Sequence, residues 1–198
     1  VVGLHGRGMS HVNAYAGMDD VEIVALCDAD TATFAEALRA IAGHGRPEPR
    51  TFQDIRKMLE QREIDVVSFA TPNHWHAPGA IWAMQAGKDV YVEKPVSHNV
   101  FEGRKMVEAA RVYRRICQAG TQSRSNPGLA EGVRYIREGH IGQVKLARGL
   151  CYKRRKSIGR VTDPTQVPST VDYSLWLGPA PQKPPMRAQF HYDWHWFW

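Results

Sequence analysis

Glu93-Lys94-Pro95 is the segment of this chain best suited to proton chemistry, because it ends the apolar run Asp89-Val90-Tyr91-Val92. The run predicts a short buried strand, which places Lys94 at the strand's carboxyl end. Lysines in partly buried sites of low dielectric have depressed pKa values and can donate or accept a proton. Pro95 restricts Lys94 to extended geometry. Most lysines are solvated surface groups, so Lys94 needs support from a ligand site beside it.

A glycine-rich turn opens the chain, with the residues Val1-Val2-Gly3-Leu4-His5-Gly6-Arg7-Gly8. It resembles the dinucleotide pattern G-x-G-x-x-G, except that His5 replaces the second glycine. Glycine is favoured there because the backbone must approach a pyrophosphate closely, while the next helix offers amide groups and a positive dipole. Such a turn can also be purely structural. The cofactor-binding candidates here are Gly3, His5, Gly6, Arg7 and Gly8.

Asp28 strengthens the nucleotide interpretation. It ends the next predicted strand and lies about 20 residues past the last glycine, where an acidic side chain binds the ribose 2′-hydroxyl. A carboxylate at that position repels a 2′-phosphate, so we expect NAD rather than NADP as cofactor. The alternative is that Asp28 only caps a helix.

The segment Thr71-Pro72-Asn73-His74-Trp75-His76 leaves the carboxyl end of another predicted strand, the edge at which open α/β sheets bind ligands. Asn73 and His76 can both donate and accept hydrogen bonds there. A metal site at His74 and His76 is not favoured, because the loop offers no carboxylate or third histidine. The three cysteines form no C-x-x-C pair, so we expect no metal.

Strand patterns alternate with helical patterns through the first part of the chain, which is typical of a doubly wound parallel sheet covered by helices on both faces. The predicted strands are 21–27, 65–70, 89–92 and 115–118, and the predicted helices are 31–42, 54–61, 78–86 and 101–113. After Gly120 the rhythm changes to a helix at 127–138, a strand at 144–152 and an irregular, proline-rich stretch at 160–185. The fold class is therefore α/β, with a second domain beginning near Gln122.

Composition narrows the function classes. The chain has 198 residues, 43% hydrophobic and 23% charged, with a formal charge of +6 and no apolar stretch near the ~18 residues that cross a bilayer. The basic run Lys153-Arg154-Arg155-Lys156 could attract nucleic acid, but no nucleic-acid motif surrounds it, so we expect a solvated loop. Both ends look cut, which leaves a cytoplasmic or exported location open.

The sequence resembles the glucose-fructose oxidoreductase, inositol dehydrogenase and rhizopine catabolism family, Gfo/Idh/MocA. The resemblance is carried by the glycine turn, Asp28, the Thr71 to His76 segment and Glu93-Lys94-Pro95. Gly120-Thr121-Gln122 and Gly139-His140-Ile141-Gly142 add to the likeness. The resemblance implies a Rossmann domain that holds NAD, here residues 1–122. It also implies the start of an open-sheet α/β domain for substrate binding and homo-oligomer formation, here the incomplete 123–198.

The resemblance also implies the chemistry, which is reversible hydride transfer between nicotinamide and a carbon bearing a sugar or polyol hydroxyl. Lys94 would bind the reacting hydroxyl and move its proton, with Glu93 and Pro95 fixing it. The residues implied to line the cofactor are Thr71, Pro72, Asn73, His76, Glu93 and Gln122. A second catalytic aspartate and histidine, usual in the family, has no match before Trp198.

The substrate-side candidates are Arg124, Tyr152 and His195. Trp194, Trp196 and Trp198 alternate along the last residues, where they would stack on a sugar ring or form a half-buried strand. Two other functions stay open at this point. Some relatives cleave glycosidic bonds with tightly held NAD, but they generally lack Glu-Lys-Pro, and a non-catalytic NAD-binding protein would need no second catalytic group.

Overall fold

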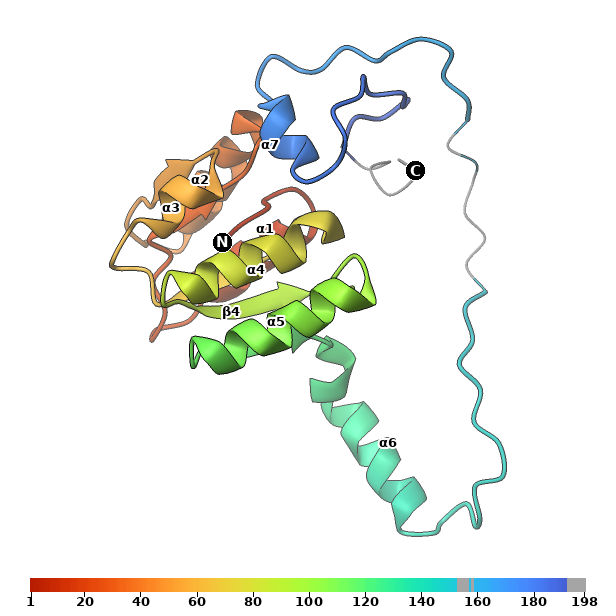
Figure 1. Cartoon of the computed structure of the whole chain (residues 1–198). Helices are drawn as coiled ribbons and strands as arrows, with labels where there is room; N and C mark the ends of the chain where they lie inside the picture. Colours follow the sequence, from red (N-terminus) through yellow and green to blue (C-terminus); the bar gives the residue numbers. More distant parts are fainter. Residues whose placement is uncertain (153–156, 158, 192–198) are drawn as a thin grey trace. The chain divides into compact units, whose positions relative to one another are not determined.

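The computed structural model describes residues 1–152, 157 and 159–191 (Figure 1). The chain divides into two compact units by its internal contacts. The first combines Val1–Gly120 with the segment that starts at Arg160, and the second is Thr121–Gly159. We call residues 160–191 the return segment, because the chain comes back to the first unit there.

The first unit is built on a parallel sheet. Its strands are β1 (Ala25–Cys27), β2 (Arg50–Phe52), β3 (Val66–Phe69), β4 (Asp89–Glu93) and β5 (Cys117–Gly120). Strand β1 pairs with β2, and β3, β4 and β5 pair in that order, all in parallel. Val2 bridges Cys27 on one side and Phe69 on the other, so the opening residues join the two groups. The predicted parallel α/β fold is therefore confirmed.

Helices follow the strands, as the alternating pattern predicts. They are α1 (Arg7–Ala16), α2 (Phe34–Gly43), α3 (Ile55–Leu59), α4 (His76–Gln85) and α5 (Val100–Val112), with 3-10 turns η1 (Thr31–Thr33) and η2 (Asn73–Trp75). Their starts are capped by side chains where the sequence offers Asp or Asn. Asp30 accepts from the Ala32 amide, and Asn99 accepts from the Glu102 amide, which satisfies amides that have no partner within the helix.

Two apolar clusters cover the two faces of the sheet. Helices α1 and α2 bury Val12 and Ile41 in one cluster with Leu4 and Leu26. Helices α3, α4 and α5 bury a second cluster with the sheet around Phe69. Each fully buried aliphatic or aromatic side chain contributes about 1.5–3 kcal/mol. The clusters hold the sheet fixed, so the loops at its carboxyl edge start from rigid strand ends.

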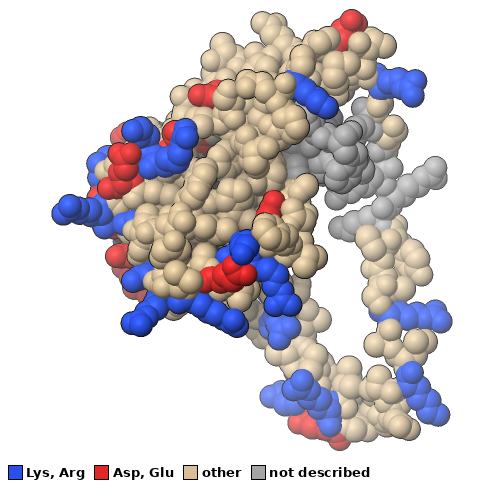
Figure 2. Space-filling model, in the orientation of Figure 1, with Lys and Arg blue, Asp and Glu red and all other residues tan. Residues whose placement is uncertain are grey.

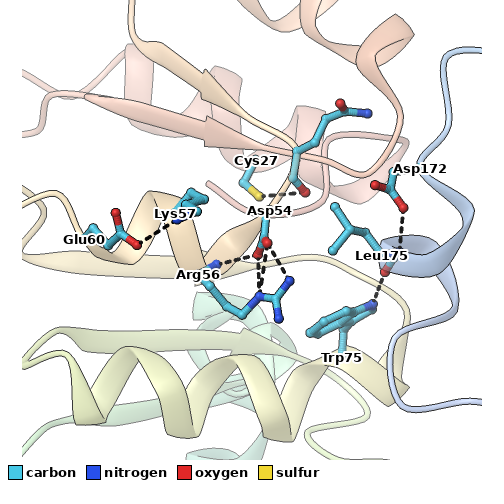
Figure 3. Close-up of polar contacts among 9 residues, drawn as sticks. Cys27, Asp54, Arg56, Lys57, Glu60, Trp75, Asp172 and Leu175 are labelled. Carbon is cyan, nitrogen blue, oxygen red and sulfur yellow. Dashed lines mark hydrogen bonds and ion pairs between the residues drawn. The ribbon is translucent and has the colours of Figure 1, made fainter.

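The sequence-based prediction misses two elements of the first unit. Strand β2 has the exposed, polar start Arg50-Thr51, which gives no apolar signal. Helix α7 (Tyr173–Leu177) lies in the stretch predicted to be irregular, and Asp172 caps it by accepting from the Leu175 amide. Figure 3 shows this cap beside the hydrogen bond from the Trp75 indole to the Leu175 carbonyl, which ties α7 to the loop after β3.

The second unit holds η3 (Gln122–Ser125) and α6 (Pro127–Arg137). Asn126 caps α6 by accepting from the Leu129 amide, and Pro127 occupies the first turn, where its missing N–H costs nothing. The strand predicted at 144–152 is wrong, because these residues are exposed and carry no strand. An alternating apolar pattern forms a strand only where a neighbouring strand supplies hydrogen bonds.

Gly79 provides a stability test of the main core. A Cβ at Gly79 would lie 2.5 Å from the Phe69 ring, which is fully buried. We predict that Gly79→Ala lowers the free energy of unfolding by about 1–3 kcal/mol through overpacking. Gly43, which ends α2, has nothing within 4 Å of an added Cβ, so Gly43→Ala should leave stability unchanged or raise it slightly. Urea unfolding compares the variants, and equal stabilities would contradict this account.

Candidate cofactor and catalytic site

The opening turn folds only because glycines stand where backbones meet. Gly3 adopts a φ of +81°, and a Cβ there would lie 2.7 Å from the Thr71 amide nitrogen. A Cβ at Gly8 would lie 1.8 Å from the Gly3 carbonyl oxygen, far inside contact distance. Gly6 precedes α1 with a φ of +65° and provides no side-chain cap. The N-cap residue of α1 therefore places no side chain over the helix start, and an open helix N-terminus of this kind is the arrangement that binds phosphate.

Asp28 lies beneath this turn. Its Oδ2 accepts from the Leu4 amide at 2.7 Å, and its Oδ1 accepts from the Asp30 amide at 2.9 Å. Burial raises the pKa of the Asp28 carboxyl, and the two amides oppose that rise only in part. Asp30, rather than Asp28, caps the following 3-10 turn. The helix-cap alternative for Asp28 therefore does not apply, and its carboxyl group stays beside the turn.

Two buried oxygen atoms lack partners in the loop after β3. Neither Thr71 Oγ1 nor Asn73 Oδ1 has a hydrogen-bond partner among the described residues. A buried polar atom left without a partner costs about 1–3 kcal/mol, so such atoms mark places where a polar ligand completes the structure. Gly3 packs directly against Thr71, which brings the loop next to the glycine turn. The turn and these oxygens together fit a dinucleotide.

His76 connects the loops that follow β3 and β4. Its Nδ1 lies 2.7 Å from the Pro95 carbonyl oxygen, and its Nε2 lies 2.7 Å from the Thr71 carbonyl oxygen. The ring is buried, and burial lowers the pKa of its imidazole. His76 therefore lies between the two loops that carry the candidate residues. Its predicted contact with the cofactor stays a prediction.

Lys94 immediately follows β4, as the sequence predicts, but its side chain is exposed rather than partly buried. The Lys94 ammonium makes no hydrogen bond or ion pair within the described part of the chain. Its amide donates to Glu93 Oε2 at 3.3 Å, and the peptide bond to Pro95 is cis. Glu93 is buried, and its Oε1 accepts from Arg7 Nε at 2.8 Å. The glycine turn and the Lys94 loop are thus joined through one carboxylate.

Sequence reasoning misses the residues behind Glu93. His11 Nε2 lies 3.1 Å from Glu93 Oε1, and His11 Nδ1 lies 2.8 Å from Ser68 Oγ. His11 stands four residues after Arg7 on α1, so the two share the helix face that looks toward β4. The spacing of four residues between Arg7 and His11 is the sequence signal that could have identified this pair. A polar histidine at an inward position of the first helix points to a buried partner.

The remaining predicted residues are spread over several parts of the chain. Gln122 and Arg124 lie in η3 and Tyr152 follows later, all exposed in the second unit. His195, the alternating tryptophans and the basic run Lys153 to Lys156 lie outside the described residues. His5 is exposed, and its ring stacks on that of His191 with centroids 5.3 Å apart. Pro72 immediately precedes η2.

Across the described residues, no three His, Cys, Asp or Glu side chains gather as metal ligands. No helix in that part of the chain combines the length and apolarity that a bilayer span requires. On the face that Figure 2 shows, Lys and Arg of the first unit lie interspersed with Asp and Glu.

Comparison with known proteins decides the family. Residues 1–121 match the model of an oxidoreductase family with an NAD-binding Rossmann fold, Gfo/Idh/MocA. This chain belongs to the Gfo/Idh/MocA family. The family assignment confirms the resemblance carried by the glycine turn and Glu93-Lys94-Pro95. It also confirms NAD as the cofactor.

The curated relatives include glycosyl hydrolase family 109 proteins of Shewanella. One is 33% identical over 141 residues, which is 69% of this chain and 28% of the relative. Another, from Shewanella pealeana, is 30% identical over 147 residues, which is 72% of this chain and 32% of the relative. The chain thus spans about a third or less of the length of these relatives.

Solved structures show the same fold. The WlbA dehydrogenase from Bordetella pertussis, in complex with NADH and UDP-GlcNAcA, is 32% identical with a TM-score of 0.59, over 70% of this chain and 41% of that one. The myo-inositol 2-dehydrogenase from Lactobacillus plantarum has a TM-score of 0.66 at 23% identity, over 72% of this chain and 41% of that one. The Rossmann-like fold of the Gfo/Idh/MocA family is therefore present in the first unit.

Gly8 tests the geometry of the turn. We predict that Gly8→Ala weakens NAD⁺ binding at least roughly tenfold, because the new methyl group displaces the Gly3 carbonyl and with it the helix N-terminus. Gly17 ends the same helix with ordinary contacts of 3.6 Å and longer, so Gly17→Ala should bind NAD⁺ as the parent does. Calorimetric titration measures both. Unchanged affinity in Gly8→Ala would contradict the placement of the cofactor at this turn.

Proposed function

We propose that the protein is an NAD-dependent oxidoreductase that transfers a hydride between nicotinamide and a hydroxyl-bearing carbon of a sugar, polyol or sugar derivative. The observation that carries the proposal is the joint placement of Lys94 and the glycine turn. Arg7 in the turn and the backbone of Lys94 both bind the Glu93 carboxylate. A proton-handling group is thereby tied to a nucleotide-binding turn, as hydride transfer to or from an alcohol requires.

Different residues would bind different parts of the cofactor. The amides at the start of α1, with Gly3 and Gly8, would bind the pyrophosphate. Asp28 would accept hydrogen bonds from the ribose hydroxyls. The cofactor would also provide hydrogen-bond partners for Thr71 Oγ1 and Asn73 Oδ1. When bound, the nicotinamide supplies the acceptor or donor of hydride. Gln122, Arg124, Tyr152 and His195 stay candidates for the remaining contacts.

Lys94 would handle the proton. As the substrate alcohol loses hydride from carbon, Lys94 would accept the hydroxyl proton, and the product is a carbonyl group. In the reverse direction the Lys94 ammonium returns that proton to the forming alkoxide. Since Lys94 is exposed, it can exchange the proton with water between turnovers.

A polyhydroxylated substrate is supported by the solved relatives. The WlbA dehydrogenase structure contains a nucleotide sugar, and the myo-inositol 2-dehydrogenase is named for a cyclitol. UDP-GlcNAcA and myo-inositol are both compounds with several hydroxyl groups. We therefore expect sugars, sugar acids and cyclitols to be the first compounds to test.

Lys94 provides the decisive variant. We predict that Lys94→Ala lowers kcat by roughly 10²- to 10⁴-fold, the usual contribution of a positioned acid or base, while the Kd for NAD⁺ changes less than about threefold. Lys105→Ala is the matched control, because that lysine lies on α5 in an exposed ion pair with Glu108. NADH absorbance and calorimetry give the two values. Equal turnover in Lys94→Ala and the parent would overturn the assignment.

Asp28 tests the cofactor preference. Asp28→Asn keeps an oxygen that can accept from a backbone amide but removes the charge that repels a 2′-phosphate. The ratio of NADP⁺ affinity to NAD⁺ affinity should therefore rise roughly tenfold or more, which corresponds to about 1.4 kcal/mol of binding free energy. Asp54→Asn is the control, since Asp54 caps α3 after the neighbouring strand. An unchanged ratio in Asp28→Asn would mean that this carboxylate does not face the ribose.

A second candidate is NAD-dependent glycoside hydrolysis, favoured by the names of the Shewanella relatives. The intact Glu93-Lys94-Pro95 sequence favours net alcohol oxidation instead. The two reactions differ in their products. With a glycoside and NAD⁺, the oxidoreductase accumulates NADH in step with substrate loss, whereas the hydrolase releases the free sugar with no net change in NADH.

A further inference from the structure

A chain of side chains runs beneath the proposed site and connects α1, β3 and β4. Tyr15 OH donates to Ser68 Oγ at 3.2 Å, and Ser68 Oγ lies 2.8 Å from His11 Nδ1. His11 Nε2 lies 3.1 Å from Glu93 Oε1, which also accepts from Arg7 Nε at 2.8 Å. Ser68, His11 and Glu93 are at most 5% exposed. We call these five residues the Glu93 network.

The hydrogen bonds of the Glu93 network have one consistent direction. An ionised Glu93 only accepts, so His11 Nε2 must carry the proton. A neutral His11 then has a lone pair on Nδ1, which accepts from Ser68 O–H, and Ser68 in turn accepts from Tyr15. Every donor meets an acceptor without a charge on His11. Burial lowers the pKa of the His11 imidazole, which agrees with the neutral form.

Glu93 stays ionised although it is buried. Burial opposes its charge, but the hydrogen bonds from Arg7 and His11 outweigh that effect and hold the pKa of Glu93 below its ordinary value. Two other titratable groups interact with Glu93 electrostatically, Tyr91 on its own strand and His76 on α4. Arg7 supplies a full positive charge that is bonded to Glu93 Oε1.

We infer that His11 is a positioning residue, which fixes the Glu93 carboxylate between the glycine turn and the Lys94 backbone. Two donors on Oε1 leave the carboxylate one orientation, and in that orientation Oε2 faces the Lys94 amide. Without His11 the carboxylate loses one of the two donors on Oε1 and can rotate more freely, so the position of the Lys94 loop relative to the glycine turn is less well fixed. The effect on turnover rests on the proposed function, but the effect on Glu93 does not.

The test uses three variants of the whole protein. His11→Phe keeps a ring of similar size in contact with Tyr15 and Tyr91 but removes both hydrogen bonds. His11→Gln keeps a donor near the position of Nε2, which makes it the rescue variant. Tyr15→Phe removes only the outermost bond and is the control. Thermal unfolding confirms that each variant is folded.

The first readout is the pH titration of Glu93 in the cofactor-free protein. It is monitored by NMR through the ¹³C chemical shift of the Glu93 carboxyl and the amide chemical shift of Lys94. We expect the pKa of Glu93 to rise in His11→Phe and to stay at the parent value in His11→Gln and Tyr15→Phe. A depressed pKa stabilises the fold above the unfolded value of about 4.3, and that stabilisation is lost as pH falls through the folded pKa. His11→Phe should therefore lose more stability at pH 7 than at pH 3.

The second readout is turnover. His11→Phe should lower kcat roughly 10- to 100-fold, with NAD⁺ affinity within about threefold of the parent, and His11→Gln should restore most of the loss. An unchanged Glu93 titration in His11→Phe, or a His11→Gln variant as impaired as His11→Phe, would overturn the inference. If the parent oxidises no sugar or polyol, the proposed function fails, while the titration still decides the role of His11.

Discussion

The close approach of backbone to backbone at the opening turn is the constraint on which the site depends. Gly8 lies against the Gly3 carbonyl, and Gly3 lies against the Thr71 backbone, at distances that leave no room for a side chain. Because of these contacts, α1 starts immediately above the sheet and the loop after β3 comes next to it. The strand ends then face the helix N-terminus, and a phosphate-binding group and polar side chains share one edge.

Two carboxylates at this edge have opposite electrostatic environments. Asp28 is bonded to neutral amides, which offset burial only in part, so its pKa is raised. Glu93 is bonded to Arg7 and His11, which more than offset burial, so its pKa is lowered. The difference follows from the donors, since a full positive charge favours a carboxylate more than an amide dipole does. Glu93 therefore suits a permanent structural charge, and Asp28 suits a group that gains partners from a bound ribose.

The sequence predicts the sheet and the glycine turn well because their signals are local. Apolar runs bounded by Asp, Gly and Pro predict β1, β3, β4 and β5, and helical spacing predicts the helices between them. The Glu93 network could not be read in the same way, because its members are separated by up to 86 residues and meet only when α1 packs on β4. The alternating pattern at 144–152 misleads, since periodicity alone says nothing about whether a partner strand is present.

The return segment shows how a distant part of the chain stabilises the same edge. The return segment contributes mainly backbone amides and carbonyls to these contacts, so the pattern of its side chains does not predict them. The Thr31 amide donates to the Thr170 carbonyl, and the Asp172 amide donates to the Ala29 carbonyl. Gly178 packs against the Trp75 ring, where a Cβ would lie 2.6 Å away. The loops after β1 and β3 are thereby held from outside as well as by the sheet. Hydrogen bonds on both sides restrict loop motion, and a site made of loop residues depends on that restriction for its geometry.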